Sequence, residues 1–387
     1  MRAAGVETRP SPPRGSEIFL QREGMSERES VPDALPATAA VRWLLHEAAR
    51  VATPATLLGE LCNRLTAEAL PIEGASLSIA SLDPLVAGRR LRWQRDNGRV
   101  IEEVLLHGMP ALEIAASSSN ALRFAFPGTR HEIEWITGCS AGFSVEQRLH
   151  LEAVSLVMTA PLEVVVGREA TRSLLRAYLG RRSADKVLSG TVRRGAGEMI
   201  EAVIWISDLR DFTLLSQTLT PEQVIIALND CCARLVGAIH PFGGEVLKFI
   251  GDGLLAIFPL AALGTKAACA ASLSAVRAAR QGMVLLDEQR VRTGLPPLPF
   301  GIALHLGAVM YGNIGAPDRL DFTAIGPAVN LTARIERLCR RLKCPVLISE
   351  AVSTQCGKLL APIGRHSMRG VKEPVTLFTL PELAPTP

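Results

Sequence analysis

The chain has 387 residues, of which 48% are hydrophobic, 21% charged and only 4% aromatic, and its formal net charge is +4. This length accommodates two globular domains, each with a core of its own. Acidic and basic residues are interspersed, and few aromatic side chains are present to stack on bases. The composition therefore argues against general nucleic-acid binding.

Cysteine usage and hydropathy bear on the cellular compartment. Eight cysteines are scattered without a paired metal-ligand spacing, which indicates free thiols in a reducing environment. The N-terminus lacks the apolar core of a signal peptide. The most apolar stretch, Leu254 to Ala262, contains Pro259 and is too short to span a bilayer. We expect a cytoplasmic protein with no membrane span.

The N-terminal third contains two different regions. Residues 1–37 are rich in Pro, Arg, Glu and Ser without periodicity, which predicts a disordered leader. Residues 38–167 begin with two helical patterns, continue with strand-like runs and close with an amphipathic segment from Val145 to about Val166. This order predicts a smaller α+β sensory domain, and it loosely resembles a GAF domain.

A connector is predicted over residues 168–197. Leu174, Leu175, Tyr178 and Leu179 recur at helical spacing, and a glycine-bearing polar stretch follows at 193–197. Such a segment could carry a rotation or register change between domains. A plain spacer helix fits the same pattern equally well.

Residues 198–381 predict a second α+β domain. A buried strand over 202–207 precedes a helix that starts at Thr220-Pro221, where Thr is the N-cap and Pro takes the first helical position. A hairpin, a long alanine-rich helix, further strands and a helix over 327–342 follow. This βαββαβ order predicts a ferredoxin-like fold.

Two aspartates are candidate metal ligands in this domain. Asp208 follows the buried strand, and Asp252 lies in the Gly251-Asp252-Gly253 turn of the hairpin. If the strands are neighbours, both carboxylates meet at one sheet edge, and such a pair suits Mg²⁺. Considered singly, Asp208 fits a helix N-cap and Asp252 an ordinary turn residue.

Three further polar residues are candidate ligand contacts. Lys248 lies between apolar neighbours of a strand, where it is either a binding residue or an edge-strand gatekeeper. Asn330 and Arg334 are four residues apart and share a helix face, which fits either one common ligand or a solvated surface. We interpret Arg337, Arg340 and Arg341 as solvated surface.

Three stretches carry a family resemblance: Trp205 to Arg210, Gly244 to Gly253 and Asp321 to Arg334. Their residues, order and spacing resemble the class III nucleotide cyclase catalytic domain. The connector over Leu175 to Gly190 is similar to that of bacterial, rhizobial-type members. The likeness covers about residues 198 to 380.

The resemblance implies a two-metal mechanism and a shared active site. Asp208 and Asp252 would hold two ions, Mg²⁺ or Mn²⁺, with help from the backbone of Leu209. One ion would activate the ribose 3′-hydroxyl and the other would bind the triphosphate. Members of the family work as dimers, so we expect a homodimer in which each site takes its metal ligands from one chain and its other residues from the partner.

The resemblance also implies substrate contacts. Asn330 would orient the ribose, and Arg334 would face the charge that develops on the α-phosphate. Arg369 lies near the position of the family's second phosphate-binding cation, and Phe212 falls among the substrate-binding positions.

Base choice follows from hydrogen-bond chemistry. Lys248 can donate to N1 of adenine, and Thr323 can accept from its 6-amino group, whereas guanine presents the opposite pattern. We therefore expect ATP as the substrate. Threonine at position 323 resembles a subclass that bicarbonate often stimulates, so bicarbonate is an expected activator that should raise the rate at fixed pH.

Two departures from the family and two alternatives remain. Asp211 stands where glycine is common, so its carboxylate either weakens ATP binding or faces solvent, and Phe242 replaces a frequent polar residue.

The alternatives to an adenylate cyclase are a guanylate or promiscuous nucleotide cyclase, and a catalytically silent dimeric signalling scaffold.

Overall fold

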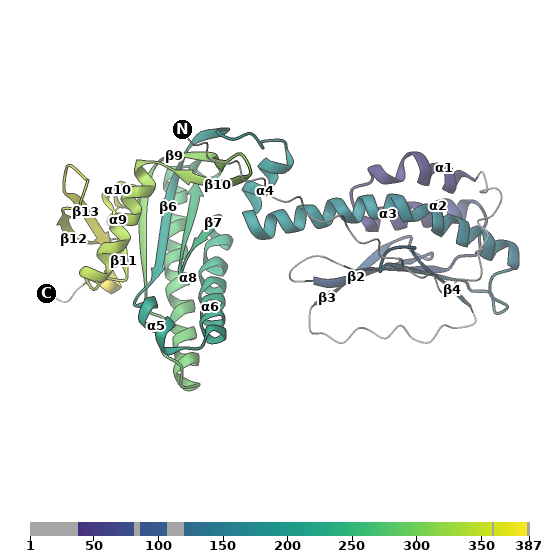
Figure 1. Cartoon of the computed structure of the whole chain (residues 1–387), viewed down its shortest axis with the longest axis horizontal. Coiled ribbons are helices and arrows are strands. Elements are labelled where there is room, and N and C mark those ends of the chain that lie inside the picture. Colours follow the sequence, from purple (N-terminus) through teal and green to yellow (C-terminus); the bar gives the residue numbers. More distant parts are fainter. Residues whose placement is uncertain (1–37, 81–85, 107–119, 358–359, 385–387) are drawn as a thin grey trace, which may run out of the picture. The chain divides into compact units, whose positions relative to one another are not determined.

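A computed structural model describes residues 38–80, 86–106, 120–357 and 360–384. The predicted leader lies outside these residues. The chain divides into two compact units (Figure 1). The first comprises the described residues of Met1–Leu77, Leu91–Ile101 and Ile114–Leu162, and the second those of Ser78–Arg90, Glu102–Glu113 and Glu163–Pro387.

The N-terminal region combines helices with a five-stranded sheet in the order β3-β2-β1-β5-β4. Its elements are α1 (Ala39–His46), η1 (Ala48–Arg50), α2 (Pro54–Ala67), β1 (Gly74–Ala80), β2 (Val86–Gln94), β3 (Val100–Leu106), β4 (Ala121–Ala125), β5 (Glu132–Ile136) and α3 (Val145–Leu179). Thr53 caps α2, with Pro54 at its first position. The expected α+β class is confirmed, and β5 was not predicted.

Helix α3 does not end where the amphipathic pattern suggested. It runs through residues 166–168 without a break and continues to Leu179, so the closing segment and the start of the connector form one helix. Gly180, with φ of 79°, separates it from α4 (Arg181–Leu188). Glycine adopts this backbone conformation without a steric penalty.

The C-terminal region is built on an eight-stranded sheet with the path β12-β13-β11-β9-β6-β8-β7, to which β10 adds by pairing with β9. Its elements are β6 (Gly197–Leu209), α5 (Phe212–Thr218), α6 (Pro221–Ile239), η2 (His240–Phe242), β7 (Glu245–Ile250), β8 (Gly253–Pro259), α7 (Leu260–Leu263), α8 (Thr265–Arg292), β9 (Phe300–Ala316), β10 (Arg319–Ile325), α9 (Pro327–Arg341), β11 (Val346–Ser349), α10 (Glu350–Cys356), β12 (Ala361–His366), β13 (Val375–Thr379) and η3 (Pro381–Leu383). The order β9-β6-β8-β7 with antiparallel pairing confirms the ferredoxin-like βαββαβ core.

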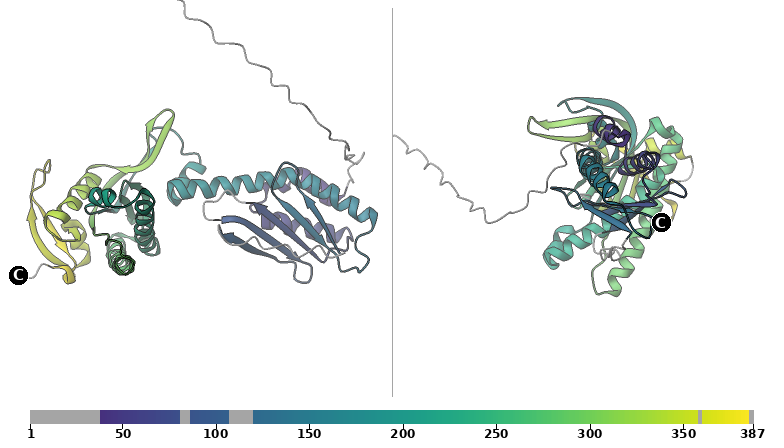
Figure 2. Two further views of the ribbon diagram at one scale, coloured as in Figure 1. Left: turned by 60° about the horizontal axis from the view of Figure 1, so that its bottom comes forward. Right: turned by 90° about the vertical axis from the view of Figure 1, so that its right-hand side faces the viewer.

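The two faces of this sheet carry different helices. Val203 and Trp205 of β6 pack into a core cluster with residues of α6 and α8, whereas Ala202 and Ile204 face a second cluster that includes Ala328 of α9. Strand alternation explains this division. The β9–β10 hairpin extends away from the sheet, as the left view of Figure 2 shows.

Two helices in the described part of the chain are long and apolar enough to cross a membrane by length and composition alone. They are α3 and the α6–η2 segment. Helix α6 contributes Cys231, Leu235 and Ile239 to the core cluster beneath the sheet, and α3 buries Val154, Met158 and Leu162.

Candidate active site

The structure brings Asp208 and Asp252 together, as the predicted strand arrangement requires. Strand β6 pairs with β8 up to Ser207 opposite Leu254, which sets the β7–β8 turn beside Asp208. The two carboxyl groups are within hydrogen-bonding reach of each other. A methyl group added at Gly253 would come within 2.7 Å of Asp208 Oδ1, so glycine is needed beside this pair.

The electrostatics of this pair favour a bound cation. Burial, followed by the charge of Asp252 and a hydrogen bond from it, raises the pKa of Asp208 to about 6. The backbone amide of Leu209 and the charge of Arg337 oppose this shift. The two carboxylates are half-buried and repel each other, so a bound cation would stabilise them. They also remain open to solvent, which leaves room for the water and phosphate ligands that Mg²⁺ or Mn²⁺ requires.

Stability of the metal-free protein should depend on this pair. The pKa of Asp208 is higher in the folded chain than its ordinary value of 3.8, so the folded state binds more protons between about pH 4 and 6. Stability should therefore fall as pH rises through this window. With EDTA at pH 7.5, thermal melts should show Asp208→Asn about 2–4 °C above the wild type, with a smaller gap at pH 5. Equal melting temperatures at both pH values would contradict this electrostatic account.

A third carboxyl group, Glu336 of α9, lies beside the pair and was not predicted. Burial, followed by the charge of Asp208, raises the pKa of Glu336 to about 7. A methyl group at Gly301 would come within 2.6 Å of Glu336 Oε1, and Gly301 is the register partner of Asp208. Within the described residues no three His, Cys, Asp or Glu side chains are grouped to hold a metal, so Glu336 borders the site without completing a ligand set. Only tertiary packing places it there.

The loop after β6 explains the departure at Asp211. Its φ is 57°, in the left-handed region where glycine is the default residue, which accounts for the glycine common in the family. Asp211 Oδ1 accepts from Arg340 Nη2 at 2.5 Å in an exposed ion pair, and Arg340 lies on the solvated surface as expected. Phe212, which begins α5, packs half-buried against the core cluster.

Lys248 lies on β7 and Thr323 on β10, and these two strands contact each other. Regular strand alternation would place Lys248 on the same face of β7 as Val246. A β-bulge between these two residues breaks the alternation, so Lys248 lies on the other face. Lys248 Nζ donates to Asp321 Oδ2 at 2.6 Å. Thr323 is 4% exposed, and its Oγ1 has no hydrogen-bond partner among the described residues.

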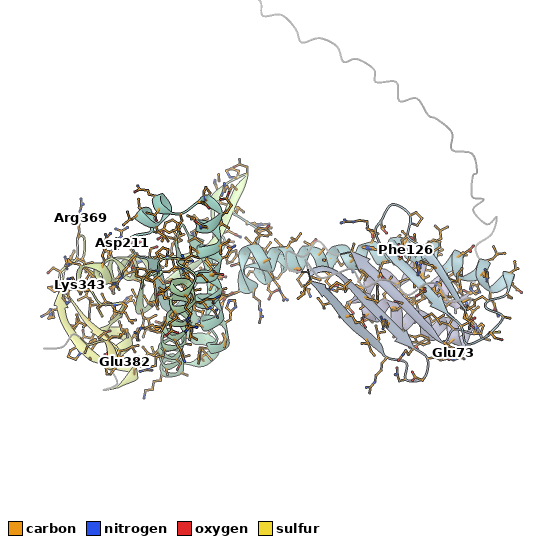
Figure 3. All side chains as sticks on the ribbon, turned by 90° about the horizontal axis from the view of Figure 1, so that it is seen from below. Glu73, Phe126, Asp211, Lys343, Arg369 and Glu382 are labelled. Atoms are coloured by element: carbon orange, nitrogen blue, oxygen red, sulfur yellow. The ribbon has the colours of Figure 1, made fainter. Side chains whose placement is uncertain are left out.

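Asn330 and Arg334 lie on α9, with Arg334 half-buried. Arg334 Nη1 donates to the carbonyl of Gly370 at 3.1 Å, which ties it to the β12–β13 loop. Arg369, next to Gly370, is exposed, and its side chain points away from the ribbon (Figure 3). The two arginines predicted to bind phosphate therefore lie close in the fold, although 35 residues separate them in sequence.

Within one chain, Asn330 lies far from the carboxylate pair of Asp208 and Asp252. The first turn of α9 packs Ala328 over Gly307, whose register partner is Ala202, six residues before Asp208 on β6. That spacing corresponds to about 20 Å along the strand. Arg334 and Glu336 are two residues apart, so they point to nearly opposite sides of α9. The predicted residues thus form separate groups within one chain.

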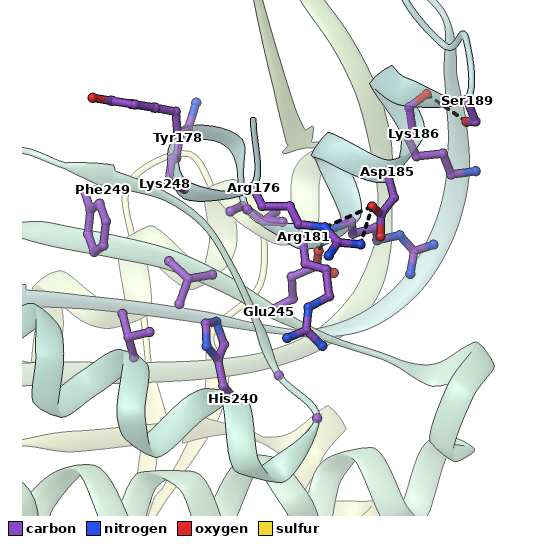
Figure 4. A pocket seen from close by; sticks show the side chains of 18 residues that line it. Arg176, Tyr178, Arg181, Asp185, Lys186, Ser189, His240, Glu245, Lys248 and Phe249 are labelled. Atoms are coloured by element: carbon purple, nitrogen blue, oxygen red, sulfur yellow. Dashed lines mark hydrogen bonds and ion pairs between the residues drawn. The ribbon is translucent and has the colours of Figure 1, made fainter. Parts of the chain in front are cut away.

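A pocket of about 1200 Å³ lies between α4 and β7 and extends to Lys248 (Figure 4). Helix α4 is fixed to the sheet at this pocket, because Glu245 accepts from the Arg182 amide at 2.7 Å and Ser183 Oγ lies 2.9 Å from the Tyr311 hydroxyl. Helix α4 of the predicted connector therefore packs as part of the C-terminal unit.

The C-terminal half of the chain is similar to known proteins. Residues 197–381 match the adenylate and guanylate cyclase catalytic domain family. The chain is 35% identical over 162 residues to an adenylate cyclase of Anabaena cylindrica, covering 41% of this chain and 31% of that protein. It is 27% identical over 172 residues to adenylate cyclase 1 of Rhizobium meliloti (strain 1021), covering 44% and 26%. The solved adenylyl cyclase CyaB from P. aeruginosa superposes with a TM-score of 0.44 at 27% identity, over 48% of this chain and 95% of that one.

Residues 197–381 therefore have the sequence and the fold of a class III adenylyl/guanylyl cyclase catalytic domain. The chain matches less than a third of the length of the two curated relatives named above.

Proposed function

We propose that the protein is an adenylate cyclase, which converts ATP into 3′,5′-cyclic AMP and pyrophosphate. The convergence of Asp208 and Asp252 carries this proposal, because it creates the cation site that ring closure needs. Divalent ions bound there would supply Lewis-acid activation of the ribose 3′-hydroxyl and charge neutralisation of the triphosphate. Arg334 would stabilise the charge that develops on the α-phosphate.

Adenine selectivity is supported by the β7–β10 contact. The buried Thr323 Oγ1 lacks a partner among the described residues, and a buried unpaired oxygen is costly unless a ligand satisfies it. The 6-amino group of adenine can donate to this oxygen. The Lys248 ammonium, which Asp321 orients, can donate to adenine N1.

A homodimer with shared sites is supported by two features. Asn330 lies far along the sheet from Asp208 within one chain, so a second chain is needed to bring both types of residue to one nucleotide. Phe249 and Ile250, next to the turn that holds Asp252, are each 54% exposed. Apolar side chains of this size at a site's edge fit an interface with a partner subunit.

Product analysis tests the proposed activity. The purified full chain is incubated with ATP or GTP and with Mg²⁺ or Mn²⁺, and cyclic products are resolved by chromatography. We expect cyclic AMP to form from ATP at least about 100-fold faster than cyclic GMP forms from GTP. The wrong base would leave buried polar groups of the site unpaired. Equal rates would indicate a promiscuous cyclase, and no product with either nucleotide would indicate a silent scaffold.

We also propose that the N-terminal region regulates the cyclase domain. Helix α3 runs unbroken to Leu179, and α4 follows at once and is bound to β7 and β9 by Glu245 and Tyr311. A change in the position of α3 would therefore act directly on the strand that carries Lys248.

A further inference from the structure

Lys248 is held by an acidic residue of the neighbouring strand. Its ammonium nitrogen donates to Asp321 Oδ2 at 2.6 Å, in an ion pair that joins β7 to β10. The two side chains are 33% and 55% exposed. Exposed ion pairs contribute little to the stability of a fold, because solvent screens them. The main effect of this contact is therefore on the position of the ammonium group.

The ion pair brings the ammonium group to the side of β10 that carries Thr323. Asp321 and Thr323 are two residues apart on this strand, whose pairing with β9 is regular. Alternate residues of a strand point to the same face and lie about 7 Å apart. Because Lys248 reaches Asp321, its N–H donors lie on the face that also presents the Thr323 hydroxyl.

Thr323 alone does not distinguish adenine from guanine. A threonine hydroxyl either accepts or donates a hydrogen bond, so it tolerates both the 6-amino group of adenine and the 6-carbonyl group of guanine. A lysine ammonium group only donates. It pairs with N1 of adenine, which is an acceptor, and it is mismatched with N1 of guanine, which carries a hydrogen. Base choice therefore depends on keeping the Lys248 ammonium group at N1.

Asp321 can keep the ammonium group at this position without consuming it. The group has three N–H donors, and the contact with Asp321 uses one of them. Without this contact, the flexible four-carbon stem of Lys248 would let the group swing toward the 6-carbonyl oxygen of guanine. We infer that Asp321 is a positioning residue that selects ATP over GTP by fixing Lys248. This inference rests on the proposed function for the identity of the substrate.

Selectivity measurements test the inference. The kcat and KM values for ATP and for GTP are measured on the purified full chain, on Asp321→Asn and Asp321→Glu, and on Asp318→Asn, an exposed aspartate in the turn before β10. Asp321→Asn should raise the KM for ATP and lower the ratio of kcat/KM for ATP to that for GTP about tenfold. Its melting temperature should stay within about 2 °C of the wild type.

The other two variants are matched controls. Asp321→Glu keeps the carboxylate, so its selectivity ratio should fall less than about threefold, and Asp318→Asn should behave like the wild type. A structural role alone would lower activity with both nucleotides equally. An unchanged or higher ratio of ATP to GTP selectivity in Asp321→Asn would overturn the inference.

A double variant shows whether Asp321 acts through Lys248. In a Lys248→Met background, Asp321→Asn should change the selectivity ratio less than about twofold, because the group that Asp321 positions is gone. A tenfold change in that background would overturn the positioning role.

Calorimetry with Mn²⁺ and non-hydrolysable ATP and GTP analogues separates this inference from the proposed function. If the wild type bound the ATP analogue more tightly but formed no cyclic product from ATP, the proposed function would fall. Loss of that binding preference in Asp321→Asn would still support the role of Asp321, and an unchanged preference would overturn it.

Discussion

Replacing Asp208 or Asp252 by asparagine is expected to lower cyclic AMP formation by about 10³-fold or more. Each substitution removes a charged ligand from the pair, and metal ions contribute several kcal/mol of transition-state stabilisation in such sites. The loss should appear mainly in kcat with saturating Mn²⁺, measured by product chromatography on the purified full chain.

The matched control for this experiment is Asp96→Asn, which changes an exposed aspartate of the N-terminal region. It should keep wild-type activity. Because the Asp208→Asn protein is expected to melt at a higher temperature than the wild type without metal, unfolding cannot explain its inactivity. Retention of more than about a tenth of wild-type activity in both active-site variants would show that these carboxylates do not hold the catalytic ions.

Mixing two inactive chains should restore activity if the sites are shared. Asp208→Asn destroys the metal half of a site, and Arg334→Ala destroys the phosphate half that the partner supplies. Equal amounts of freely exchanging chains form about half heterodimers, each with one intact site of two, so the mixture should reach about a quarter of wild-type activity. The rate is measured after co-incubation over a range of protein concentrations.

A second mixture controls for this result. Asp208→Asn combined with Asp252→Asn carries both lesions in the same half-site, so no heterodimer contains an intact site, and activity should stay at background. Recovery in both mixtures, or in neither, would contradict shared sites.

The fold of the catalytic domain could be predicted where the pattern is local. The helix start at Thr220-Pro221 and the Gly251-Asp252 turn both formed as expected, because each depends on residues within a few positions. The full extent of α3 was not predicted, because the amphipathic pattern up to about residue 166 and the helical spacing over 174–179 were assigned to separate segments. Strands β5 and β12 were also missed, because their stability comes from pairing with distant strands.

The positions of the site residues were likewise predictable only where they follow from the order of the strands. The convergence of Asp208 and Asp252 followed from strand order, but the position of Glu336 depends on α9 packing against Gly301, which leaves no signal in sequence spacing. The orientation of Lys248 was not predictable either, because the β-bulge before it shifts the side chain to the other face of the strand than regular alternation predicts.

The most direct test of the account is the position of Mn²⁺ in crystals grown with a non-hydrolysable ATP analogue. Anomalous scattering should reveal two ions, each with carboxylate oxygens of Asp208 and Asp252 at about 2.0–2.3 Å and phosphate oxygens completing the shell. Density for the analogue with both carboxylates free of metal, or with Mn²⁺ held elsewhere, would contradict the claim that this pair drives ring closure.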